Sequence, residues 1–77
     1  MTSEHVQWEF GRVLWERRNE CGLSQEALAL SADVDRAFVR QMERGIRQPA
    51  LRTIWKLARA LDTKPSVLLS EVERALR

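Results

Sequence analysis

Arginines dominate the middle of this 77-residue chain, and they suit one kind of chemistry, the recognition of polyanions. Residues 36–59 carry seven basic residues against one acid, Glu43, whereas residues 1–35 carry three arginines against seven acids. Most of the basic residues are arginine, whose planar guanidinium pairs with phosphate or with the edge of guanine. On charge alone, a solvated face that only keeps the domain soluble explains the pattern equally well. A polyanion site therefore needs a structural element that presents these arginines together.

The chain offers little for catalysis or metal binding. Cys21 is the only cysteine, which excludes an internal disulfide and a multi-cysteine metal site, and the only histidine is His5. A length of 77 residues allows one small domain without a large substrate cavity. We therefore expect no enzyme, no catalytic or metal site and no cofactor. No apolar run approaches the roughly 18 residues of a membrane span, so we expect a cytoplasmic protein with no membrane partner.

The spacing of apolar residues predicts an all-α fold in which residues 1–77 form a single, compact five-helix domain. Gly22 and Gly45 are expected to follow the ends of the first and third helices, and Ser24 and Asp35 to cap the starts of the second and third. Pro65 suits the first position of the fifth helix. The expected helices span about 4–20, 25–31, 36–44, 50–61 and 65–76.

The same spacing assigns each helix an inner face and leaves the third helix with a polar outer face. The inner residues are expected to be Phe10, Val13, Leu14, Leu28, Ala29, Ala32, Val39, Met42, Leu51, Ile54, Leu57, Ala58 and Leu61. The outward residues of the third helix are expected to be Arg36, Ala37, Arg40, Gln41 and Arg44. A helix fits the DNA major groove, where arginine can pair with O6 and N7 of guanine.

At these residues the sequence resembles the phage-repressor-like (Cro-type, XRE) helix-turn-helix family, and most of all small restriction–modification controller proteins. The shared segments are FGRVL at 10–14, GLSQEALA at 22–29, VDRAFVRQMERG at 34–45 and the LxxIxxLAxAL pattern at 51–61. The resemblance implies a phage-repressor-like fold with its helix-turn-helix at residues 25–44. It also implies that the recognition helix, 36–44, enters the major groove of double-stranded DNA.

The resemblance further implies which side chains contact DNA. The implied set is Gln25, Arg36, Ala37, Arg40, Gln41, Arg44, Arg47 and Arg52. Arg36, Ala37 and Arg40 would face base edges, whereas Gln25 and the outlying arginines would contact phosphates. Two further residues, Arg18 and Glu43, match positions that often form an ion pair beneath the motif.

The chain departs from the family pattern at four positions. Asp33 and Asp62 stand where glycine is common after a helix, and Ala50 stands where a capping serine is common. Arg17 stands where a core leucine is frequent, so it must extend its charge to solvent or pair with Glu20 or another acid. None of the four lies on the expected DNA face.

One recognition helix reads few base pairs, so we expect a homodimeric transcriptional regulator that binds a palindromic operator. The interface is expected at the end of the fourth helix and along residues 65–77, through Trp55, Val67, Leu68, Val72 and Leu76. Trp8, Trp15 and Trp55 lie beside the apolar stripes, where exposed rings can mark a partner surface. The alternative is an antitoxin or adaptor of the same fold whose main partner is another protein.

Overall fold

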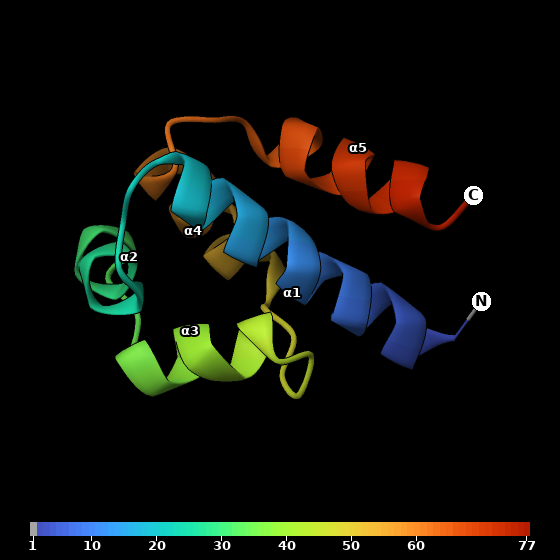
Figure 1. Cartoon of the computed structure of the whole chain (residues 1–77), viewed down its shortest axis with the longest axis horizontal. Coiled ribbons are helices and arrows are strands. Elements are labelled where there is room, and N and C mark those ends of the chain that lie inside the picture. The colour runs from blue at the N-terminus through green and yellow to red at the C-terminus, as the bar shows by residue number, and fades with distance from the viewer. Residues whose placement is uncertain (1) are drawn as a thin grey trace.

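The computed structural model describes residues 2–77, which form helices and connecting turns without a strand (Figure 1). The helices are α1 (Ser3–Glu20), α2 (Gln25–Ala32), α3 (Arg36–Glu43), α4 (Leu51–Ala60) and α5 (Pro65–Ala75). Each expected bound lies within one residue of the observed one, so the prediction of five helices is confirmed. No helix in this part of the chain is long and apolar enough to cross a membrane.

The helix ends follow from local residue chemistry. Gly22 and Gly45 adopt φ values of 72° and 73°, a left-handed conformation that glycine enters without steric cost. The Ser24 side chain accepts a hydrogen bond from the Ala27 N–H, and Asp35 accepts one from the Ala37 N–H. These contacts confirm both expected caps, and the Asp35 cap ends the short turn between α2 and α3.

The departures from the family pattern also behave as expected. Asp33 and Asp62 take up the left-handed conformation, with φ values of 56° and 55°. This conformation is uncommon outside glycine, although aspartate tolerates it better than most residues. Ala50 provides no side-chain hydrogen bond to the start of α4. These three positions therefore weaken helix ends without altering the path of the chain.

The hydrophobic core lies between the five helices, with α1 packed on α3 and α5, and α2 packed on α3 and α4. Its buried residues are Phe10, Val13, Leu14, Leu28, Ala29, Ala32, Val39, Met42, Leu57, Ala58, Leu61, Leu68 and Val72. Ile54 is partly buried against this cluster. The prediction that Leu51 faces inward is wrong, because 66% of its surface is exposed. Leu51 is the first residue of α4, and the core covers that helix only from Ile54 onward.

A glycine allows α3 to lie directly against α1. A Cβ atom on Gly11 would stand 2.3 Å from the carbonyl oxygen of Met42 and 3.1 Å from that of Glu43. The backbones of the two helices therefore approach more closely than any side chain on α1 would permit. Figure 1 shows α3 and α5 on opposite sides of α1. The contact at Gly11 therefore determines the distance between the α1 and α3 backbones.

The fifth helix completes the core instead of standing free. Leu68 and Val72, which were expected at a dimer interface, are 0% and 5% exposed within the single chain. The prediction is wrong for these two residues, because α5 packs against α1 and both side chains belong to the core of the single chain. Arg17 forms an ion pair with Glu71 of α5, and the hydrogen bond raises the pKa of its guanidinium. The partner acid is thus on α5, not Glu20.

Candidate nucleic-acid interface

The third helix presents its cations outward. Val39 and Met42 are 0% exposed and hold α3 to the core, whereas Arg36 and Arg40 lie on the exposed side. Arg44, at the C-terminal cap of the helix, is also exposed. Ala37 and Gln41, the remaining outward positions of the prediction, are half-buried. The three arginines predicted to face outward are therefore exposed, and the other two predicted positions are only partly so.

A buried ion pair fastens the end of α3 to α1. Arg18 is 8% exposed, and its Nε donates to Glu43 Oε2 at 2.6 Å while its Nη2 donates to Glu43 Oε1 at 2.9 Å. The remaining Nη1 donates to the Leu23 carbonyl at 2.8 Å. The hydrogen bond to Glu43 raises the pKa of the Arg18 guanidinium. This is the pair that the family resemblance implied, and it connects the C-terminal end of α3 to α1 and to the loop at Leu23.

Gln25 takes part in the same network. Its Nε2 donates to Glu43 Oε1 at 3.0 Å, so the first residue of α2 is linked to the last residue of α3. The sequence reasoning assigned this amide to a phosphate and did not anticipate the internal bond. This half-buried amide adds a side-chain bond between the two helices of the motif.

Arg47 lies beside α3 although it belongs to the following loop. Its guanidinium carbon sits 5.2 Å from the centroid of the Phe38 ring, and its Nη1 donates to Gln41 Oε1 at 3.5 Å. Its backbone N–H also donates to the Gln41 carbonyl at 3.3 Å. A cation–π contact at an exposed site stabilises by about 0.5–1 kcal/mol. The loop arginine is therefore held near the outer face of the recognition helix.

The start of α1 supports this loop from the other side. Gln7 Nε2 donates to the Gly45 carbonyl at 2.9 Å. A Cβ on Gly45 would lie 3.1 Å from Trp8 Cδ1, so the indole packs against the turn while 57% of Trp8 remains exposed. The sequence did not predict this contact, because 38 residues separate Gln7 from Gly45 and no local pattern links them.

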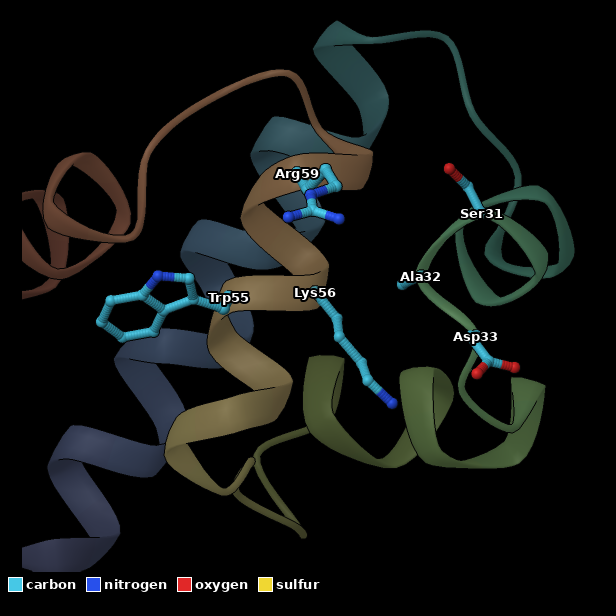
Figure 2. A pocket seen from close by; sticks show the side chains of 6 residues that line it. All are labelled: Ser31, Ala32, Asp33, Trp55, Lys56 and Arg59. Carbon is cyan, nitrogen blue, oxygen red and sulfur yellow. The ribbon is translucent and has the colours of Figure 1, made fainter.

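A second surface, on α4, is apolar instead of basic. Leu51 and Trp55, one turn apart, are 66% and 55% exposed, and we call them the α4 stripe. Beside it lies an open depression lined by Ser31, Ala32, Asp33, Trp55, Lys56 and Arg59. In Figure 2 the Trp55 ring points away from Ser31 and Asp33, so these residues do not close around a ligand. Of the expected interface residues, Trp55 is thus exposed, whereas Val67 and Leu76 are half-buried.

Comparison with known proteins identifies the family. The family model described as Helix-turn-helix matches residues 16–68. Control protein C.BamHI of Bacillus amyloliquefaciens is 38% identical over 68 residues, which cover 87% of this chain and 84% of that protein.

Solved structures of similar fold also include control proteins. The restriction-modification controller protein C.AhdI from Aeromonas hydrophila is 47% identical with a TM-score of 0.78, covering 80% of this chain and 94% of that one. The controller protein C.Esp1396I, solved as a tetramer with its natural 35 base-pair operator, shares the fold at 22% identity and a TM-score of 0.81, covering 90% of this chain and 91% of that one. The chain therefore belongs to the helix-turn-helix family, among the restriction–modification control proteins.

Proposed function

We propose that this protein is a sequence-specific transcriptional regulator that inserts α3 into the major groove of double-stranded DNA. The observation that carries the proposal is the pair Arg36 and Arg40, exposed on the outer side of a helix whose inner side is sealed by Val39 and Met42. Each guanidinium can pair bidentately with a guanine edge. A control protein of the same fold was solved on its operator, which supports this assignment. The proposal requires no catalytic group or cofactor, and it places the protein in the cytoplasm.

The residues of the site divide into base-reading and phosphate-binding groups. Along α3, from its first residue onward, base edges would meet the side chains of Arg36, Ala37, Arg40 and Gln41. The residues around them would contact phosphates of the flanking backbone: Gln25, Arg44, Arg47 and Arg52. Such contacts would supply most of the salt-dependent affinity and little of the sequence preference.

The function further requires a second copy of the chain. Recognition helices of a dimer enter successive major grooves about 34 Å apart on one side of the duplex. The domain measures 32 × 22 × 21 Å, so two copies in side-by-side contact would separate their equivalent helices by a distance of this order. We assign the contact to the α4 stripe, Leu51 and Trp55, because Leu68 and Val72 are used within the chain. A two-fold axis through such a patch makes it complementary to itself.

Selection of duplexes from a random pool tests the DNA-binding proposal. We expect a palindrome with half-sites about one helical turn apart. On the selected site, Arg36→Ala should lose about 1–3 kcal/mol of binding free energy and relax the preference at one base pair per half-site. The matched control is Arg74→Ala, which removes an exposed arginine of α5 and should bind like the unaltered protein. Failure to bind any duplex at low salt, or an Arg36→Ala variant with unchanged selectivity, would overturn the proposal.

Sedimentation at tens of micromolar tests the dimer. Trp55→Ser should shift the protein toward monomer, because it removes the larger side chain of the α4 stripe. Trp15→Ser is the matched control, since Trp15 is 52% exposed on α1 and Trp55 is 55% exposed on α4. A dimer that survives Trp55→Ser would refute the assignment of the α4 stripe, and an unaltered protein that is monomeric would refute the dimer.

A further inference from the structure

The surface shared by α2 and α3 contains one feature that opposes DNA binding. Glu26, in the first turn of α2, places its Oε2 3.7 Å from Nη1 of Arg36. Both side chains are largely solvent-exposed, at 68% and 62%. They line one open depression together with Arg18, Ser24, Gln25 and Arg40. A carboxylate here would face the phosphates that the neighbouring arginines attract.

Folding stability gains little from this acid, whose place in the first turn of α2 favours the start of that helix by about 0.3–1 kcal/mol. An exposed ion pair contributes about 0–1 kcal/mol, since both charges remain well hydrated and two flexible side chains must be ordered. The ion pair that organises the motif is the buried one between Arg18 and Glu43, at 2.6 Å. The Glu26–Arg36 contact therefore acts chiefly on where the Arg36 guanidinium lies before DNA arrives.

Glu26 has two effects on DNA binding, one that is the same for every sequence and one that favours the operator. Its negative charge repels every phosphate within a Debye length, about 8–10 Å at physiological salt, so it weakens binding to all sequences. Its contact with Arg36, at 3.7 Å without a hydrogen bond, attracts the guanidinium and biases it toward Glu26 and the start of α3. This bias favours a ligand that meets the guanidinium there and disfavours its movement out to a backbone phosphate.

We propose that Glu26 is a specificity-determining residue of the DNA site, an inference that rests on the proposed function. It holds Arg36 over the N-terminal end of the recognition helix, where a guanine edge would meet it, and discourages Arg36 from pairing with backbone phosphates. Glu26 thus lowers the affinity for random DNA more than the affinity for the operator. The consequence is a larger ratio between the two affinities.

A double-mutant cycle tests this proposal. The unaltered protein, Glu26→Gln, Arg36→Ala and the double variant are each measured on the selected operator and on a random duplex of equal length. Glu26→Gln keeps the shape of the side chain and removes its charge. We expect this variant to bind the random duplex about 3–10-fold more tightly, which is the effect of removing one negative charge near the phosphates at the protein surface. Its affinity for the operator should change little. In the Arg36→Ala background the same change should tighten both duplexes equally.

Controls separate this inference from the function on which it rests. Glu73→Gln removes an exposed acid of α5 and should leave the affinity ratio unchanged. If the unaltered protein does not distinguish the operator from random DNA, the proposed function fails. If it does distinguish them and Glu26→Gln tightens both duplexes by the same factor, only the role of Glu26 is refuted. Thermal melting of all variants verifies that they are folded.

Discussion

Replacement of Gly11 by alanine distinguishes local helix propensity from the packing of α3. Within α1, the change should stabilise the helix by about 1 kcal/mol, because alanine loses less backbone entropy than glycine. The new Cβ, however, would lie 2.3 Å from the Met42 carbonyl oxygen, a backbone atom that no rotamer change can move away. Relief of the contact requires α1 and α3 to separate by about 1 Å, since unstrained carbon contacts need about 3.5 Å.

Overpacking of this kind costs about 1–3 kcal/mol and occasionally more. The clash involves backbone on both sides, so we expect it to exceed the propensity gain and leave Gly11→Ala less stable by about 1–2 kcal/mol. For a domain of this size that lowers Tm by roughly 5–15 °C, measured by circular dichroism. Operator affinity should fall as well, because the displaced helix carries Arg36 and Arg40.

Gly22→Ala provides the matched control for this prediction. Its added Cβ would meet no atom within 4 Å, and its only cost is the φ of 72°, so it should lose stability without losing selectivity for the operator. A Gly11→Ala protein that melts at or above the temperature of the unaltered chain would show that α1 and α3 are not locked by this contact.

Three further predictions concern the buried pair, a helix cap and the phosphate contacts. Glu43→Gln leaves the Arg18 charge buried without its counter-ion and should cost about 3 kcal/mol in urea unfolding; a loss below about 1 kcal/mol would mean that the pair is solvated. Ala50→Ser supplies the missing cap of α4 and should raise stability by about 0.5–1 kcal/mol in thermal melts, whereas an unchanged Tm would indicate that solvent already satisfies those N–H groups. Arg52→Ala should weaken binding to operator and random duplexes by the same factor and reduce the salt slope by about one, so a loss confined to the operator would identify Arg52 as a base reader.

Local patterns anticipated most of the fold because each depends on a few neighbouring residues. Gly45 ends α3 since it enters a left-handed conformation freely, and Ser24 and Asp35 cap helices through bonds that reach two or three residues along the chain. The polar face of α3 followed from helical spacing alone, as did the burial of Val39 and Met42.

Contacts between distant residues could not be anticipated in this way. The sequence predicts that Arg17 either extends its charge to solvent or pairs with an acid, but it does not show that Glu71, 54 residues away, supplies that acid. Leu68 and Leu51 are the same residue type, each within a helix, yet Leu68 is 0% exposed and Leu51 is 66% exposed. Which of them is buried depends on where one helix crosses another.

The order of amino acids therefore specified where the helices begin and end and which sides of α3 are apolar and basic, because backbone torsions and helical periodicity act over a few residues. The close approach at Gly11, the internal bond of Gln25 and the distribution of exposed apolar side chains depended on the assembled domain. Each arises from distances between elements remote in the chain, and those distances exist only after the core has packed.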